Sequence, residues 1–256
     1  MAARTNSAAP RSNRVLIISL TVIVTLVAVL VAGELYVRHN VKTCMADQFE
    51  SQLGSQVDVG LSWKPVLLQS IDKNTPYITI DSDDTRFGPA EGMQVHARIN
   101  DIRIEDNADS SGTIGSSEAS VNWSTEGILT TLQQQTFGSL ISGVTADSNA
   151  GTLKFDVGPA GLAGLTVKPT VSNGTVDVET VGAEILGFGL PTDLVDGIVQ
   201  TLTSSLQTYP LGMQPTSLQV TDDAINITLD GGPYTMPPAD TAAQQQQQQS
   251  SCGILL

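Results

Sequence analysis

The sequence is short of the residues on which many common functions depend. It has two cysteines and two histidines in 256 residues, and aromatic residues make up only 4% of the chain. Two cysteines exclude a disulfide-dense scaffold and a four-cysteine zinc site, and two histidines leave little material for a histidine-rich metal centre. Any hydrophobic core must be mainly aliphatic, and we predict neither a metal nor a cofactor.

Positive charge is also scarce. The chain has 12 basic and 26 acidic side chains, a formal net charge of −14 at pH 7. A nucleic-acid-binding protein needs a basic surface that matches the phosphate backbone. The composition therefore argues against a nucleic-acid partner, and the acidic excess is typical of a domain kept soluble outside the cell. Nothing in the sequence identifies a protein partner.

A long uncharged and mainly apolar run, residues 15–33, lies close to the N-terminus. A helix over residues 15–33 spans roughly 28 Å at about 1.5 Å per residue, close to the hydrocarbon core of a bilayer. Three arginines and no acidic residue precede the run, so the positive-inside rule keeps residues 1–14 in the cytoplasm. We predict a single-pass helix in the cell membrane with an extracytoplasmic domain. The alternative is a signal peptide cleaved near Val31-Ala32-Gly33, which leaves the same domain secreted.

The charge is divided unevenly by this run. The residues after position 33 carry nine basic and 26 acidic side chains, a formal charge of −17 (9 − 26). Such a domain does not adhere to anionic lipid through bulk electrostatics, so a lipid contact should be apolar or use a local basic spot. An oxidising compartment also permits a Cys44–Cys252 disulfide, and the sequence does not decide whether it forms.

Apolar spacing in the rest of the chain alternates between helical and strand periods. Residues 34–54 are predicted to continue the N-terminal helix, a second helix runs from Ser124 to Ile141, and a third begins at Pro191. Runs of period two predict strands between them, with hairpins at Asn173-Gly174 and Asp222-Asp223. Because hairpins join the strands, we predict an α+β fold with an antiparallel sheet.

Three local features interrupt these patterns. Pro65 ends or distorts the strand that starts at Val57, and the apolar residues after it match neither a strand face nor a polar loop. The apolar phase slips by one residue inside the strand that starts at Met93, which predicts a β-bulge near Asn100-Asp101. Residues 233–256 are rich in proline and glutamine, and we predict a disordered tail after a domain over residues 34–232.

Sequence motifs of the common catalytic classes are absent. The chain has no H-E-x-x-H, no Walker loop, no G-x-S-x-G and no G-x-G-x-x-G at a strand–helix turn. His96 alternates with apolar neighbours, which indicates a solvent-facing strand residue and not a base. A pair of carboxylates for glycoside hydrolysis stays open, because 26 acidic residues make some spatial pair almost inevitable. We predict a protein that is not an enzyme.

Three stretches together resemble the actinobacterial LmeA-like phospholipid-binding family. The first is the N-terminal helix with residues 63–69, in which Pro65, Leu67 and Gln69 match the family and Val66 replaces its phenylalanine. The second is LTVKPTVSNG at 165–174, in which a proline precedes an Asn-Gly hairpin. The third is residues 209–223, in which a Pro-Leu-Gly turn precedes the last hairpin. Their order and spacing agree with the family from Glu34 to Gly232, least well over residues 81–120.

The resemblance implies an exported envelope protein that binds phospholipid non-covalently, in lipid or lipoglycan maturation. It also implies a tubular lipid-binding type of fold, in which a strongly curved antiparallel sheet wraps around a long helix. Two alternatives stay open from the residues. One is an anchored interaction module without a lipid cavity, and the other is an accessory of a lipoglycan-processing enzyme.

Candidate lipid-binding residues fall into two sets. A buried methylene contributes about 0.8 kcal/mol, so an apolar groove needs no strong headgroup charge, although Lys64 and Lys73 flank the first set and could meet a phosphate. Core packing is the alternative role for every apolar member, because groove-lining and core residues look alike in a sequence. The first set is Trp63, Lys64, Val66, Leu67, Leu68 and Ile71, and the second is Leu129, Leu132, Phe137, Leu194, Ile198 and Leu202.

Overall fold

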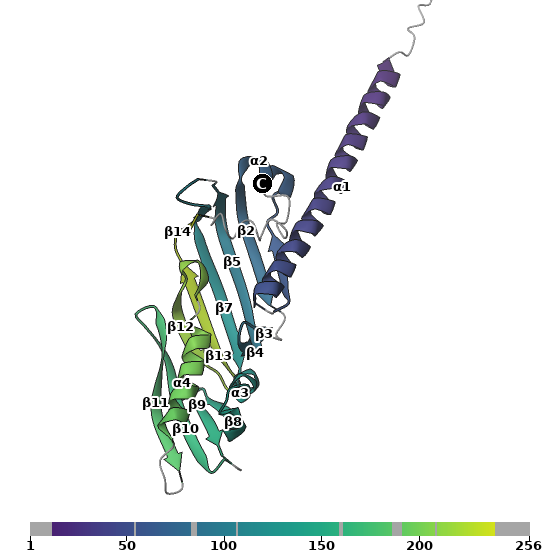
Figure 1. Ribbon diagram of the computed structural model, residues 1–256. Helices are drawn as coiled ribbons and strands as arrows, with labels where there is room; N and C mark the ends of the chain where they lie inside the picture. The colour runs from purple at the N-terminus through teal and green to yellow at the C-terminus, as the bar shows by residue number, and fades with distance from the viewer. Residues whose placement is uncertain are drawn as a thin grey trace, which may run out of the picture.

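The computed structural model describes residues 12–53, 55–82, 86–105, 107–158, 161–185, 191–207 and 209–238. Figure 1 shows an elongated molecule in which a long N-terminal helix leans against one edge of a tall sheet. A second, smaller sheet lies beyond one end of the tall sheet and carries a helix of its own. Cys252, and with it the question of a Cys44–Cys252 disulfide, lies outside the described residues.

The N-terminal helix α1 (Ser12–Leu53) has two different halves. The large apolar side chains of its first half are 52–69% exposed, and this half is long and apolar enough to cross a membrane. The second half packs against β1 (Val57–Leu61), where Val41 of the helix is 3% exposed. The predicted apolar helix and its continuation beyond residue 33 are confirmed.

The larger sheet has eight strands, and its main path runs in the order β1-β2-β5-β7-β13-β12 with antiparallel neighbours throughout. Two short strands extend it, because β6 pairs with β5 and with β14. The bounds are β2 (Asn74–Ser82), β5 (Met93–Ile104), β6 (Gly112–Ile114), β7 (Ser116–Ser124), β12 (Gln214–Val220), β13 (Ala224–Gly231) and β14 (Tyr234–Met236). A separate two-stranded hairpin joins β3 (Arg86–Phe87) to β4 (Ala90–Glu91).

The smaller sheet has four strands in the order β11-β10-β9-β8, and one hydrophobic core joins it to the larger sheet. Helix α4 packs on β11, and α3 contacts both β8 and β7. The bounds are α3 (Thr125–Gln133), η1 (Gly138–Leu140), β8 (Ile141–Asp147), β9 (Thr152–Val157), β10 (Ala163–Ser172), β11 (Thr175–Ile185), α4 (Thr192–Leu206) and η3 (Pro210–Gly212).

Several local predictions are confirmed because their signals lie within a few residues. Ser124 caps α3 by accepting a hydrogen bond from the Gly127 amide at 3.0 Å. Asn173 and Gly174 have φ angles of 51° and 75° and join β10 to β11, as a two-residue hairpin turn requires. The α+β class and the antiparallel pairing are confirmed. The described strands form no closed barrel, and the position of α1 along β1 is compatible with a curved sheet around a long helix.

Other local predictions were wrong. No bulge forms near Asp101, because β5 keeps one register with β2 on both sides of that residue. Asp101 instead has a φ of 52°, and Ile102 is buried on the face opposite Ile99. The predicted helix from Ser124 stops at Gln133, and a 3-10 turn precedes β8. Paired structure also continues to Met236, past the domain boundary predicted at Gly232.

Candidate functional site

The larger sheet has one apolar face. Directly opposed residues on antiparallel strands project to the same side of a sheet. The apolar face is therefore made of consecutive cross-strand rows that run along the sheet. The rows are Leu61-Ile78-Ile99, Val59-Ile80-Ala97-Ala119-Leu229, Val95-Val121-Ile227-Leu218 and Met93-Trp123-Ile225-Val220.

Burial on this face is graded. At one end Met93, Trp123 and Ile225 are at most 4% exposed and belong to the core that includes α3 and the smaller sheet. At the β1 edge Val59 is 1% exposed, and α1 packs against that strand. Between these regions some apolar side chains, such as Val95 and Ala119, are buried, whereas another set is only half-buried. We call this set the apolar strip: Leu61, Ile78, Ile80, Ala97, Ile99 and Val121.

The apolar strip ends beside a short helix, α2 (Val66–Asp72), that the sequence patterns did not predict. Pro65 precedes it and provides no side-chain cap. The cap comes from α1, because the Glu34 carboxylate accepts hydrogen bonds from the amides of Val66 at 2.7 Å and Leu67 at 3.3 Å. A carboxylate is favourable there because it faces unpaired amides and the positive end of the helix dipole. Arg38 of α1 donates to the carbonyls of residues 61 and 62 and lies 4.0 Å from Glu34.

Polar bonds hold the inward side of α2. Gln69 is 5% exposed, and its amide donates to Ser62 Oγ at 3.2 Å and to the Lys64 carbonyl at 2.6 Å. The Gln69 oxygen accepts from Thr75 Oγ1 at 2.8 Å. Every polar atom of this buried amide side chain thus has a partner, which its burial requires. The inward contacts of α2 also include the apolar Val66, which is 3% exposed.

Lys64 and Asp72 join the two ends of this segment. Lys64 Nζ lies 2.5 Å from Asp72 Oδ2 and donates to the Asn74 carbonyl at 2.8 Å. The hydrogen bond from Lys64 holds the pKa of Asp72 below its ordinary value, because it favours the charged carboxylate. The charge of Lys64 is balanced within the segment, whereas Lys73, which ends α2 with a φ of 53°, is exposed.

The outward side of α2 is apolar. Trp63 is 77% exposed, Leu67 39%, Leu68 51% and Ile71 81%. We call these four residues the α2 patch. On α1 next to Glu34, Leu35 and Tyr36 are 63% and 70% exposed. The apolar surface of the first half of α1 thus continues onto α2.

The structure separates the two predicted sets of site residues. The first set surrounds α2, with Val66 facing inward. Leu132, Leu194, Ile198 and Leu202 are at most 5% exposed. Leu129 and Phe137 are half-buried against the same core. Figure 1 shows α2 at one end of the larger sheet and α3 and α4 at the other.

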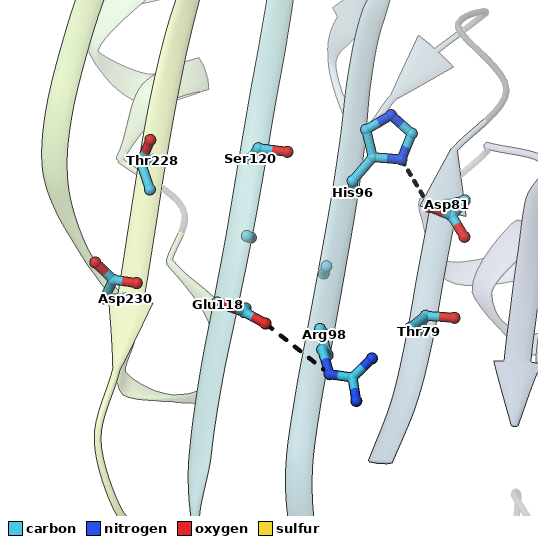
Figure 2. A pocket seen from close by; sticks show the side chains of 10 residues that line it. Thr79, Asp81, His96, Arg98, Glu118, Ser120, Thr228 and Asp230 are labelled. Carbon is cyan, nitrogen blue, oxygen red and sulfur yellow. Dashed lines mark hydrogen bonds and ion pairs between the residues drawn. The ribbon is translucent and has the colours of Figure 1, made fainter. Parts of the chain in front are cut away.

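The polar face of the larger sheet has an open pocket of about 360 Å³ (Figure 2). Asp81, His96 and Ser120 are cross-strand partners in it, and His96 Nδ1 lies 2.6 Å from Asp81 Oδ1. This row has the residue types of a hydrolase triad, but among the described residues no hydrogen bond links His96 to Ser120. Figure 2 shows His96 turned toward Asp81 on one neighbouring strand, with Ser120 on the strand at its other side, and His96 is 60% exposed. This geometry does not activate Ser120 as a nucleophile.

Comparison with known proteins agrees with the apolar surfaces. A sequence model of the LmeA-like phospholipid-binding family matches residues 28–230. The chain belongs to this family. Three mycobacterial proteins, one from Mycobacterium bovis and two from Mycobacterium tuberculosis, are each 30% identical to it over 230 residues. Each is described as an uncharacterized protein, and the match covers 88% of this chain and 65% of the relative. No solved structure matches the chain.

Proposed function

We propose that this protein is a membrane-anchored, extracytoplasmic protein that binds phospholipid non-covalently along the apolar strip. Membership of a phospholipid-binding family supports lipid as the ligand. The observation that carries the assignment to this place is the strip itself, in which six aliphatic side chains from four neighbouring strands of the apolar face are only half-buried. Half-buried aliphatic side chains in continuous rows offer a surface to a second apolar molecule.

The strip has the dimensions of one acyl chain. From Ile99 to Val95, which lies opposite Val121, the four steps of β5 span about 14 Å at roughly 3.4 Å per residue. One leaflet takes up about 15 Å, half of a hydrocarbon core about 30 Å thick. At about 0.8 kcal/mol per methylene, ten buried methylenes contribute roughly 8 kcal/mol before the cost of ordering the chain. An acidic domain can therefore hold an acyl chain without a strong charge pair to the headgroup.

The second predicted set of residues lies at the far end of the strip. We place the chain terminus near Leu129 and Phe137, which are half-buried against the core. Leu132, Leu194, Ile198 and Leu202 support that end as core residues. The headgroup then lies at the α2 end, where Lys73 and Arg103, the cross-strand partner of Asn74, are exposed and Lys64 is paired with Asp72. We infer an envelope phospholipid or a lipid-linked glycan precursor as the cargo, because the apolar run of α1 holds the domain at a membrane.

Photolabelling tests this function. The full chain is placed in phosphatidylcholine vesicles that contain a phospholipid with a diazirine near the middle of one acyl chain. After irradiation, mass spectrometry locates the labelled residues. We expect label on Ile78, Ile80, Ala97 and Ile99, in addition to the label that residues 15–33 acquire inside the bilayer.

Two matched variants sharpen the test. Ala97→Trp fills the strip with an apolar side chain, and we expect about tenfold less label on β5. Ser120→Trp adds the same side chain on the polar face of the neighbouring strand, and we expect wild-type labelling. If Ala97→Trp remains folded by circular dichroism and is labelled like the wild type, the strip is not the site. Label confined to residues 15–33 would favour an anchored interaction module.

A further inference from the structure

Helix α2 distributes its polar and apolar side chains in the opposite way to an ordinary surface helix. A helix on a soluble domain turns its apolar side chains inward and its polar side chains to water. In α2 the inward side holds the fully bonded amide of Gln69, while Ile71 and Leu68 face outward at 81% and 51% exposure. The exposed apolar surface also includes Trp63, which precedes Lys64 in the chain. This distribution suits a segment whose outer side meets an apolar medium.

The position of α2 along α1 indicates which apolar medium the outer side of α2 meets. Glu34 is the first residue after the uncharged run 15–33, and its carboxylate bonds the first two amides of α2. The start of α2 is therefore held at the level where the apolar run of α1 ends. The same level carries Tyr36, which is 70% exposed. Tryptophan and tyrosine are enriched at the boundary between hydrocarbon and water.

We propose that the α2 patch inserts into the outer surface of the bilayer that α1 crosses, as a second membrane contact. The proposal rests on the membrane anchorage of α1 proposed above. Charge permits it, because Lys64 is paired with Asp72 and Glu34 is bonded to two amides and lies near Arg38. No unbalanced acidic group of the α2 segment is then brought to the lipid surface.

The second contact has a consequence for lipid transfer. A single transmembrane helix leaves the domain free to rotate about the helix axis. Contact through both α1 and α2 fixes the domain, so that the row Leu61-Ile78-Ile99 lies beside the membrane surface. A phospholipid can then enter the apolar strip at that row without crossing water.

Tryptophan fluorescence provides the test, because the chain has only two tryptophans and they lie in opposite environments. Trp63 is 77% exposed, and Trp123 is fully buried. The full chain is reconstituted in phosphatidylcholine vesicles with and without bromine atoms on the acyl chains. The difference between the wild type and Trp63→Phe isolates the Trp63 emission. We expect brominated lipid to quench Trp63 by about half or more and to leave Trp123 unchanged.

Two pairs of variants isolate the cause. Ile71→Glu should restore most of the quenched Trp63 emission, whereas Val181→Glu, at an exposed apolar residue of β11, should not. Glu34→Ala should weaken the quenching because α2 loses its cap, and Glu50→Ala, at an exposed position of the same helix, should leave it unchanged. Unaltered Trp123 emission shows in each case that the core is folded.

The outcomes separate docking from anchorage and lipid binding. Retention of the protein on vesicles through an alkaline carbonate wash reports the anchor, and labelling of β5 reports the strip. If the protein is retained but Trp63 emits equally in brominated and ordinary vesicles, docking of the α2 patch is refuted and anchorage stands. Release of the protein by the wash refutes the anchorage and docking together.

Discussion

Helices α2 and α4 carry similar aliphatic side chains in opposite environments. In α4, Leu194, Ile198 and Leu202 are at most 5% exposed and form part of the core between the sheets. In α2, Leu68 and Ile71 are 51% and 81% exposed. Both sets look like candidate lipid contacts in the sequence. The difference arises from how each helix is attached, because α4 is held by its apolar face and α2 mainly by polar bonds to Glu34, Ser62 and Thr75.

This comparison shows that the structure can fix an apolar helix face in an exposed position as firmly as in a buried one. A short helix held mainly through its polar groups, with Val66 as its one buried apolar side chain, has its other apolar side chains left for an external partner. A helix held through its apolar side chains has none to offer. Three predictions test whether α2 and α4 differ in this way, from the largest expected effect to the smallest.

Truncation of an isoleucine in each helix should separate them most clearly. Ile198→Ala should lower the free energy of unfolding by about 2–5 kcal/mol, because it leaves a cavity in the core. Ile71→Ala should change it by no more than about 0.5 kcal/mol, because the side chain already meets solvent. Urea unfolding of the detergent-solubilised chain, followed through the buried Trp123, measures both. Equal losses would show that Ile71 has a packing partner.

Loss of the buried amide should release α2 and leave α4 in place. Gln69→Leu removes the partners of Ser62 and Thr75, and each buried group left unpaired costs about 1–3 kcal/mol. We expect faster hydrogen exchange at the α2 amides and unchanged exchange in α4. Gln134→Leu is the matched control, since Gln134 is exposed and its side chain bonds only to Glu91 among the described contacts. Faster exchange in both helices of Gln69→Leu would mean that α2 and α4 open together.

Acidification should act on α2 with the smallest effect. The folded-state pKa of Asp72 lies below its ordinary value of 3.8 because Lys64 donates a hydrogen bond to the carboxylate. The ion pair therefore contributes stability above the ordinary pKa and loses it as the pH falls through the lower, folded-state pKa. Trp63 emission should be constant from neutral pH to about pH 5 and change only in more acidic solution. In Asp72→Asn this acidic change should be absent, and its persistence would assign it to another carboxylate.

Signals confined to a few residues predicted much of the fold. Ser124 and Asn173-Gly174 act on their immediate neighbours, so a helix cap and a hairpin could be recognised directly. Helix α2 could not, because its cap is Glu34, 32 residues earlier. The phase change after Ile99 was misread for a similar reason. Ile102 is buried on the other face opposite Thr75, whose hydroxyl bonds to Gln69 of α2.

The candidate site likewise has features that the sequence could predict and features that it could not. The sequence supplied the residue types around Trp63 to Ile71 and a family resemblance that the match over residues 28–230 confirms. It could not show that Lys64 is paired with Asp72. Nor could it show the apolar strip, whose members come from four strands and meet only when those strands align.

The sequence by itself determined an N-terminal helix with an uncharged run over residues 15–33, an acidic domain of hairpin-linked strands and membership of a phospholipid-binding family. These depend on composition and on spacing along the chain. The tertiary structure alone decided which aliphatic side chains are hidden and which are exposed. Burial requires a partner surface. Ile198 finds one in the core, whereas Ile80 lies on a sheet face that is only partly covered. Ile71 is exposed, and we propose that its partner is the bilayer.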